Sequence, residues 1–324
     1  MSETPRWTIA IPTFNGAQFI AQAVRSVQAQ TDGDFELVVC DDGSQDDTLA
    51  IVQRTCGDRA RIVANTTSQP LGLAGNWNRC VAEASGDWVT ILHQDDLLEP
   101  EFLARHRAIA SLHRDIGLIL GPVKMIDLAG QPIDSGDADF TWPDRFVVWP
   151  PQALSRVLAT GNPIRCPGVS FRRDMHERVG GFDPRWRYVL DWHFWHRAGQ
   201  ASSVAFVETP LARQRWHQAS ETHKLARGTI DLEENAKLMR SILAGEPFLP
   251  SERPLIEAKI RNRMAIAWTN RAYQAACRGD RRAEAHALKQ AWIENPAVLI
   301  KTLVRDPKAF MRLILGGSGR SRNA

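Results

Sequence analysis

Two pairs of neighbouring aspartates are the first groups in this sequence that suggest chemistry. Asp41-Asp42 and Asp95-Asp96 each come close after a short apolar run. Adjacent carboxylates repel each other, and a divalent cation removes that repulsion. Hard oxygen ligands of this kind suit Mg²⁺ or Mn²⁺, which also bridge to substrate phosphates. The two pairs therefore predict a metal-assisted reaction on a phosphate-bearing substrate.

A solvated turn beside a helix cap is the ordinary alternative for such pairs. That alternative is the better interpretation of Asp46-Asp47, because these acids suit the positive N-terminal end of a helix. For Asp41-Asp42 alone, a solvated turn and a functional role are equally supported. A functional role is favoured for Asp95-Asp96, since an acidic pair placed against a buried strand is costly.

Other common phosphate and hydrolase sites are missing from the sequence. No G-x-G-x-x-G follows the first apolar run, and no G-x-x-x-x-G-K-[ST] is present. These absences argue against a Rossmann dehydrogenase and a P-loop NTPase. No G-x-S-x-G nucleophile elbow is present either, which argues against a serine hydrolase of that type.

The elements that would position these acids alternate along the first half of the chain. Short apolar runs are separated by amphipathic segments, a pattern typical of repeated β-α units and a largely parallel sheet. In one such segment Ile20, Ala23, Val24 and Val27 have the spacing of a helix face. The expected strands are Thr8–Ile11 (stopped by Pro12), Phe35–Cys40, Arg61–Ala64, Trp88–Leu92 and Gly117–Gly121. Ligands of parallel α/β sheets bind beyond the carboxyl ends of the strands, where both acidic pairs are expected.

The second half of the chain has a different character. The segment Asp127–Pro150 is rich in Asp, Gly and Pro and is expected to be a loop. After about Leu225 long helical patterns predominate, and they predict an α/β domain over residues 1–225 and a helical region over residues 226–324. Ile256–Cys277 and Arg282–Trp292 are expected to form a helical hairpin that ends at Pro296.

Composition and charge limit the class of protein. At 324 residues, with 44% hydrophobic and 24% charged residues, the chain is typical of a globular protein. A net charge of +3 gives no reason to expect nucleic acid. Five cysteines without a C-x-x-C pair favour a reducing cytoplasm over a disulfide framework. With no apolar leader behind Met1 and no membrane-spanning run, we expect a soluble cytoplasmic protein, or one held at the inner face of a membrane.

An ordered set of motifs resembles the family 2 glycosyltransferases over about residues 7–220. Any one motif is weak, but the ordered set is highly specific. The motifs are Ile11-Pro12-Thr13-Phe14-Asn15, Val39–Thr48, Gly75-Asn76-Trp77-Asn78, Ser85-Gly86-Asp87-Trp88, Leu92-His93-Gln94-Asp95-Asp96, Val179–Asp183 and Tyr188–Trp192.

The resemblance implies a GT-A fold, in which a Rossmann-like, mostly parallel sheet is flanked by helices, here followed by a C-terminal helical appendage. It also implies an inverting transfer of a sugar from a nucleotide-diphosphate donor, commonly a UDP-sugar, to a hydroxyl of a glycan or lipid-linked saccharide. Asp191 falls on the position of the catalytic base. Residues 1–225 are then the nucleotide-sugar-binding catalytic domain. Asp95 and Asp96 are the implied contacts of Mg²⁺ or Mn²⁺. Arg213–His217 resembles a later motif of the family near the diphosphate, which implies His217 as a further contact of the metal or of a phosphate. The implied donor contacts are Pro12, Thr13, Asn15, Asp41, Asp42, Asn76, Asn78 and Asp95.

The sequence departs from the family at His93, where the commoner form has an aspartate. The change leaves one fewer hard ligand, and His93 is then either a ligand or a spacer. Trp186, Trp192 and Trp195 surround Asp191 in sequence. They are expected to dry the site or stack on sugar rings, with plain core packing as an equal alternative.

Two other functions compete with the transferase. A catalytically inactive GT-A module acting through its helical tail draws support from the His93 departure, but intact Asp95, Asp96 and Asp191 oppose it. A nucleotidyltransferase would need a glycine- and arginine-rich loop near the first strand, where Pro12-Thr13-Phe14-Asn15 stands instead.

The C-terminal tail raises a separate hypothesis. Ala297–Leu315 mixes apolar with basic residues, and Pro307 divides it. Such a segment can lie on an anionic membrane, where lipid-linked acceptors are found. The ordinary alternative is a helix packed on the core of the protein itself.

Overall fold

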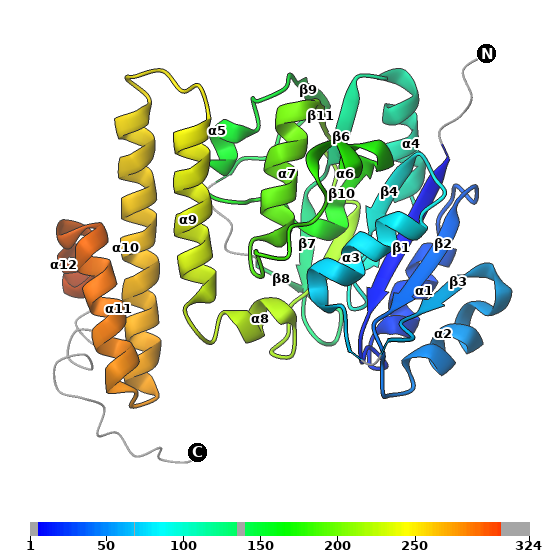
Figure 1. Cartoon of the computed structure of the whole chain (residues 1–324), viewed down its shortest axis with the longest axis horizontal. Helices are drawn as coiled ribbons and strands as arrows, with labels where there is room; N and C mark the ends of the chain where they lie inside the picture. The colour runs from blue at the N-terminus through cyan, green and yellow to red at the C-terminus, as the bar shows by residue number, and fades with distance from the viewer. Residues whose placement is uncertain (1–5, 68, 135–139, 306–324) are drawn as a thin grey trace. The chain divides into compact units, whose positions relative to one another are not determined.

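The computed structural model describes residues 6–67, 69–134 and 140–305. The chain divides into two compact units, Met1–Gly228 and Thr229–Ala324. Sheets with flanking helices form the first unit, and helices form the second (Figure 1). The division lies close to the boundary proposed at residue 225, and the roles assigned to the two domains stay predictions.

A mixed sheet of eight strands forms the centre of the first unit. Its order is β3-β2-β1-β4-β10-β6-β11-β9, in which β10 and β9 run antiparallel to their neighbours. The mostly parallel α/β architecture predicted from the sequence is therefore confirmed. The strands are β1 (Trp7–Thr13), β2 (Glu36–Asp41), β3 (Arg61–Ala64), β4 (Trp88–Ile91), β6 (Ile116–Leu120), β9 (Val147–Trp149), β10 (Val169–Arg172) and β11 (Ser203–Phe206).

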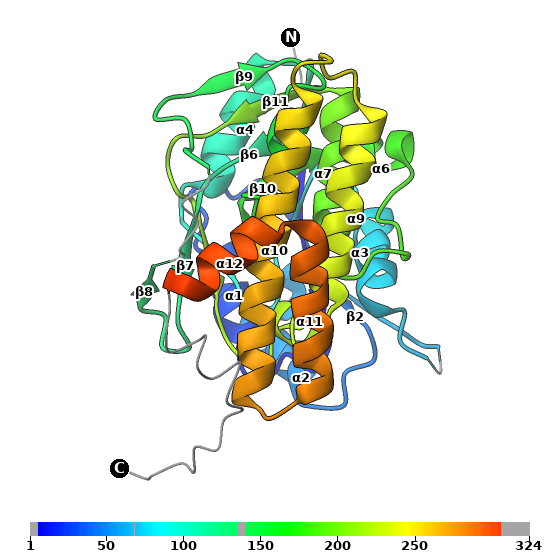
Figure 2. The same ribbon diagram turned by 90° about the vertical axis from the view of Figure 1, so that its left-hand side faces the viewer.

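Helices cover both faces of this sheet (Figure 2). One face packs on α1 (Ile20–Gln28), α2 (Thr48–Cys56) and α4 (Phe102–Leu112), and the other on α3 (Gly72–Glu83), α6 (Arg173–Val179) and α7 (Leu190–Ala201). The predicted apolar face of the first helix is confirmed, because the buried residues of α1 are the four with helical spacing. Shorter elements are α5 (Ser155–Leu158), α8 (Glu221–Leu225), η1 (Gly57–Arg59) and η2 (Cys166–Gly168).

The expectation that Pro12 stops the first strand is wrong. β1 continues to Thr13, and Pro12 pairs in register with Cys40 of β2. In a parallel strand both backbone polar groups of a residue face the same neighbour, so Pro12 faces the same side as Ala10, towards β4. Pairing with β4 ends at Ala10, opposite Ile91. The missing N–H of Pro12 is therefore not required by any partner strand.

The expectation of a loop throughout Asp127–Pro150 is wrong in two places. β8 (Pro132–Ile133) extends a second sheet of order β5-β12-β7-β8, and β9 forms the edge of the main sheet beside β11. β9 forms because its short apolar run can bury Trp149 on Phe206, with ring centroids 4.3 Å apart. The other strands of the second sheet are β5 (Leu97–Leu98), β7 (Val123–Ile126) and β12 (Ala212–Arg215).

The second unit contains the predicted helical hairpin. Its helices are α9 (Ile230–Gly245), α10 (Arg253–Cys277), α11 (Arg281–Glu294) and α12 (Pro296–Arg305). α10 and α11 pack along each other, and α12 lies across both of them (Figure 2). Gly279 adopts a φ of 73° and ends α10. Pro296 follows the end of α11 as expected, but it also opens α12 at the first helical position, where proline is tolerated.

The start of α11 depends on one carboxylate. Asp280 accepts a hydrogen bond of 3.0 Å from the backbone N–H of Ala283. Replacing Asp280 with alanine should lower the free energy of unfolding of the helical unit by about 1 kcal/mol, because one N–H loses its partner. Chemical denaturation measures the change. Asp280→Asn keeps an acceptor oxygen and is the matched control, and equal losses in both variants would contradict a capping role.

Much of the segment proposed to contact a membrane, residues 306–315, lies outside the described residues, as does the rest of the C-terminal tail. In the part of the chain that the structure describes, every helix is too short or too polar to cross a bilayer.

Candidate active site

Four neighbouring parallel strands end at one edge of the main sheet, and the polar residues of interest follow them. β3, β2, β1 and β4 lie side by side in that order. Asp41 ends β2, Thr13 ends β1, and His93 follows β4 after one residue. The sheet therefore brings together residues that are up to 80 positions apart in the sequence.

Gln94 joins the ends of β1 and β4. Its Oε1 accepts hydrogen bonds from Thr13 Oγ1 at 2.6 Å and from the N–H of Phe14 at 2.9 Å, and its Nε2 donates to the Phe14 carbonyl. Gly16 leaves room for this amide, since a Cβ there would lie 2.3 Å from Gln94 Oε1. Asn15 extends the connection to β2, because its Oδ1 accepts from the N–H of Gln45 at 2.8 Å.

The first acidic pair is buried and already has hydrogen-bond donors. Asp41 Oδ2 accepts from the N–H groups of Gly43 and Ser44, so this carboxylate shapes its own turn. Asp42 accepts from the N–H groups of Leu71 and Gly72, at 2.7 and 2.9 Å, where α3 begins. Both side chains thus hold the loops around the ends of β2 and α3. A contact with a nucleobase, as the sequence implied, stays a prediction.

Two asparagines of α3 connect this edge to the rest of the unit. Asn76 Nδ2 donates to the carbonyl of Cys40 at 3.0 Å, while its buried Oδ1 has no hydrogen-bond partner among the described residues. Asn78 accepts from the N–H of Phe182 and donates to the carbonyl of the same residue, each at 2.8 Å. The amide of Asn78 therefore holds the Gly180–Phe182 turn, and its predicted role in donor binding is untested.

The second acidic pair forms a compact group with His93. One ligand atom from each of His93, Asp95 and Asp96 lies within 4.8 Å of the others. His93 Nδ1 is 3.3 Å from Asp96 Oδ2. Both His93 Nε2 and Asp96 Oδ2 are buried without a well-aligned hydrogen bond among the described residues, and their neighbours are the Cys166 thiol for His93 and this long contact for Asp96. Buried polar atoms without partners are unfavourable unless another group binds them, so this donor set fits a divalent cation.

The neighbouring groups act on the protonation of all three residues. Burial lowers the pKa of His93, but Cys166 and Asp96 outweigh it and raise that pKa, so a cation bound through the imidazole would displace its proton. Burial, followed by the neighbouring charge of Asp95, raises the pKa of Asp96 to about 6. Burial also raises the pKa of Asp95, but the hydrogen bond from His217 and the charge of His93 outweigh it and lower that pKa. A cation at this position would relieve the repulsion that raises the pKa of Asp96.

His217 and Arg215 support the acidic pair from the end of β12. His217 Nε2 lies 2.8 Å from Asp95 Oδ2, within hydrogen-bond distance. Arg215 is buried, its backbone N–H donates to Asp96 Oδ1 at 2.9 Å, and its Nε donates to the Asp95 carbonyl at 3.1 Å. The rest of its guanidinium donates to the carbonyls of Asp127 and Leu128 and to Gln22 Oε1.

Asp191 lies in the first turn of α7, and its carboxylate acts electrostatically on the same group. Burial raises its pKa, while the N–H of Trp192 and the charges of His93 and Arg165 act in the opposite direction. Trp192 N–H donates to Asp191 Oδ1 at 2.6 Å. The net result is a raised pKa, and a carboxylate with a raised pKa is a stronger base.

Residues 8–180 match the sequence model described as Glycosyl transferase family 2. The chain belongs to this family. The matched segment contains both acidic pairs and ends before Asp191.

Curated relatives of this family 2 chain are also glycosyltransferases. A PGL/p-HBAD biosynthesis glycosyltransferase of Mycobacterium bovis is 34% identical over 194 residues, which are 59% of this chain and 68% of the relative. An uncharacterized glycosyltransferase of Nostoc sp. is 26% identical over 237 residues, 71% of this chain and 70% of the relative. The chain is accordingly a glycosyltransferase.

Solved structures of glycosyltransferases share its fold. S. aureus TarS 1–349 in complex with UDP-GlcNAc has a TM-score of 0.66 and 18% identity, over 95% of this chain and 87% of TarS 1–349. The mannosyltransferase PcManGT from Pyrobaculum calidifontis, in complex with GDP-Man and Mn²⁺, has a TM-score of 0.59 and 18% identity, over 96% of this chain and 81% of PcManGT. The GT-A fold implied by the sequence motifs is confirmed.

The tryptophans near Asp191 in this family 2 glycosyltransferase are mostly buried. Trp195 packs on Phe171 and Phe194, with ring centroids 5.9 and 5.3 Å apart. Trp77 of α3 instead contacts His93, at a centroid distance of 4.9 Å. Core packing therefore accounts for Trp195, and Trp77 is the aromatic side chain that contacts the acidic group.

The sequence analysis did not identify Arg215, Gln94 or Trp77 as site residues. A signal for Arg215 was present, since Arg213, Arg215 and His217 alternate as side chains on one side of a strand do. Gln94 and Trp77 lie within two of the family motifs, but their contacts could not be predicted because their partners come from distant parts of the chain.

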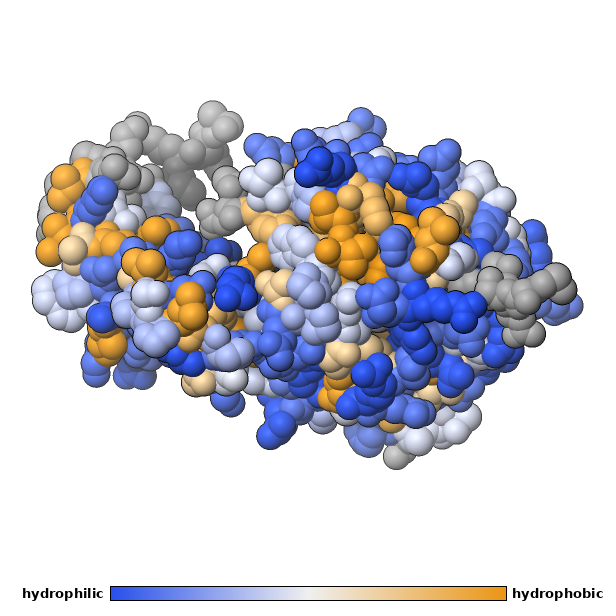
Figure 3. Space-filling view, turned by 90° about the horizontal axis from the view of Figure 1, so that it is seen from above, coloured by the Kyte–Doolittle hydropathy of each residue, from blue (hydrophilic) through white to orange (hydrophobic). Residues whose placement is uncertain are grey.

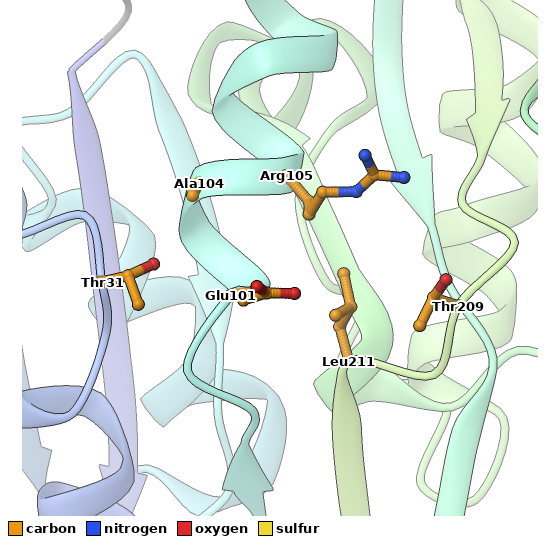
Figure 4. Close-up of a pocket in the computed structure, with 6 residues that line it drawn as sticks. All are labelled: Thr31, Glu101, Ala104, Arg105, Thr209 and Leu211. Carbon is orange, nitrogen blue, oxygen red and sulfur yellow. The ribbon is translucent and has the colours of Figure 1, made fainter.

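A surface pocket of about 310 Å³ contains none of the predicted site residues (Figure 4). It is lined by Glu101, which precedes α4, by Ala104 and Arg105 of α4, and by Thr31, Thr209 and Leu211. Arg105 is paired with Glu208 at 2.5 Å. The family 2 motifs therefore point to the strand-end group and not to this pocket.

Proposed function

We propose that this glycosyltransferase moves a sugar, with inversion, from a UDP-sugar to a hydroxyl of a glycan or lipid-linked saccharide, with Mg²⁺ or Mn²⁺ as cofactor. The observation that carries the proposal is the compact group of His93, Asp95 and Asp96, whose ligand atoms lie within 4.8 Å of one another close after the end of β4. The TarS structure is a complex with UDP-GlcNAc and the PcManGT structure a complex with GDP-Man and Mn²⁺, which supports this class of donor and cofactor.

In the proposed reaction Asp191 is the general base. An acceptor hydroxyl is a weak nucleophile at neutral pH, and a carboxylate within hydrogen-bond distance increases its reactivity by taking its proton. The acceptor oxygen forms a bond to the anomeric carbon as the bond from that carbon to the diphosphate oxygen breaks. The products are the glycosylated acceptor, the nucleoside diphosphate and a protonated Asp191. One displacement inverts the anomeric centre and requires no carboxylate nucleophile.

The cation would be held by Asp95, Asp96 and His93, with His217 orienting Asp95 by its hydrogen bond. When bound, such a cation stabilises the negative charge that develops on the leaving diphosphate. His217 was predicted from the sequence as a direct metal contact, and its contact with Asp95 also fits a supporting role. The two carboxylates suit Mg²⁺ and Mn²⁺ alike.

The donor would lie along the ends of β2, β1 and β4. We assign its contacts to the residues that the motifs implied. These are Pro12, Thr13, Asn15, Asp41, Asp42, Asn76, Asn78 and Asp95. Among these residues, Asn76 has a buried Oδ1 without a hydrogen-bond partner in the described part of the chain. This oxygen can therefore accept a hydrogen bond from the donor substrate.

Binding of UDP with a divalent cation tests the proposal without knowledge of the acceptor. We expect MnCl₂ with UDP to raise the Tm of the full chain by several degrees, and EDTA to abolish the shift. At a UDP concentration about 100 times its Kd the stabilisation is about 2.7 kcal/mol. Differential scanning fluorimetry measures the shift.

Asp96→Asn is the informative variant in this experiment, because it removes a ligand charge but keeps the volume. We expect it to bind UDP with much less dependence on Mn²⁺. Asp87→Asn, on the exposed turn before β4, is the matched control. A UDP affinity that EDTA leaves unchanged in the wild-type protein would contradict the role of the metal.

A further inference from the structure

The two units of this chain carry charges of opposite sign. Residues 229–324 contain 17 Lys and Arg against 10 Asp and Glu, a formal charge of +7, whereas residues 1–228 have a formal charge of −4. The two values add to the net charge of +3. The small net charge therefore conceals a strongly basic helical unit.

The end of α11 and the outer face of α12 expose large apolar side chains. Trp292 and Ile293 of α11 are each 55% exposed, and Ile300 and Val304 of α12 are 53% and 69% exposed. Ile300 and Val304 are four residues apart, so they share one side of α12, and Leu299 faces the interior at 6% exposure. We call Trp292, Ile293, Ile300 and Val304 the apolar ledge.

The sequence of this segment predicted either a helix packed on the core of the protein or a segment lying on a membrane, and α12 agrees with each in part. One side packs on α10 and α11, as the core-packed alternative required. The other side remains open in the part of the chain that the structure describes. Single exposed apolar residues are ordinary. Four large ones within 13 residues of chain form an exposed apolar patch, and such patches mark interaction sites.

The charged groups around the ledge are basic. Lys289 and Lys301 are exposed, and Lys301 lies next to Ile300. The one acid between them, Glu294, is buried and paired with Arg240 at 2.6 Å. In Figure 3 the helical unit, at the left, shows apolar residues among hydrophilic ones. Between positions 289 and 304 the ledge therefore combines an exposed tryptophan, aliphatic side chains and lysines with no exposed acid, which is the composition of an interfacial helix.

We propose that the apolar ledge, with Lys289 and Lys301, binds the surface of an anionic lipid bilayer. The four apolar side chains enter the interfacial region, and the lysines contact lipid phosphates. Charge complementarity favours this partner over a dimer in which two ledges meet, because such a dimer would bring two +7 units together. The inference goes beyond the proposed reaction and does not depend on it.

Vesicle flotation of the full chain tests the proposal. We expect it to float with vesicles of phosphatidylcholine and phosphatidylglycerol, to bind pure phosphatidylcholine at least tenfold more weakly, and to dissociate as NaCl rises. Ile300→Glu with Val304→Glu should reduce binding to the anionic vesicles at least tenfold. Leu112→Glu is the matched control, since Leu112 is 78% exposed on α4 in the acidic unit.

Two further readouts separate the possible failures. Circular dichroism and UDP binding should be unchanged in the double variant, which distinguishes loss of the ledge from loss of folding or of the active site. Equal vesicle binding by wild-type and double variant overturns the proposal. A wild-type dimer that the double variant converts to monomer, with no vesicle binding by either, assigns the ledge to self-association and also overturns it.

Discussion

Replacing Asp191 with asparagine should lower the turnover number by about 10²- to 10⁴-fold while leaving the affinity for UDP unchanged. Asparagine has the same shape, and its Oδ1 can still accept from the N–H of Trp192. An amide does not take a proton from the acceptor hydroxyl, so the chemical step slows while the donor still binds. Steady-state turnover of the donor and calorimetric UDP binding measure the two effects.

Asp174→Asn is the control for this experiment. Asp174 lies in the first turn of α6 as Asp191 does in α7, but it is exposed and paired with Arg172 at 2.8 Å. Its replacement should leave turnover within about twofold, because an exposed ion pair contributes little. Full activity in Asp191→Asn would remove Asp191 from the mechanism.

Replacing Arg215 with methionine should lower the free energy of unfolding by more than about 3 kcal/mol, because one buried cation donates hydrogen bonds to several carbonyl oxygens that would lose their partner. These carbonyls belong to Asp95, Asp127 and Leu128. Urea denaturation measures the loss. We also expect weaker Mn²⁺-dependent binding of UDP, since Arg215 holds the backbone of the acidic pair.

Arg213→Met provides the comparison for Arg215. Arg213 belongs to the same strand, but its side chain is 35% exposed and forms an ion pair with Glu99 at 2.9 Å. Its loss should cost less than about 1 kcal/mol. Similar decreases in the free energy of unfolding of the two variants would contradict a special contribution from the burial of Arg215.

Local patterns in the sequence predicted those parts of the fold that local physics determines. The apolar face of α1 follows from helical spacing, and the break between α10 and α11 follows from Gly279 and Asp280. β12 escaped prediction because three of its four residues are polar, Arg213-Gln214-Arg215. It is a strand because β5 and β7 pair with it, which is a tertiary effect.

The candidate site was predictable to a similar extent. The position of the acidic pairs at strand ends followed from the order of apolar runs and from the family motifs. The partners of each carboxylate did not, because they depend on loops that fold back from far along the chain. Asp42 accepts from α3, 29 and 30 residues later, and His217 contacts Asp95 from 122 residues away.

The fit between Gly16 and the amide of Gln94 has a consequence for evolution. The two positions lie 78 residues apart in the sequence but share one small volume. A larger residue at position 16 would be tolerated only with a shorter one at position 94. The shorter residue would lose the hydrogen bonds by which Gln94 joins the ends of β1 and β4. Drift at either position is therefore constrained by the other, and the pair should change together or not at all across descendants of this sequence.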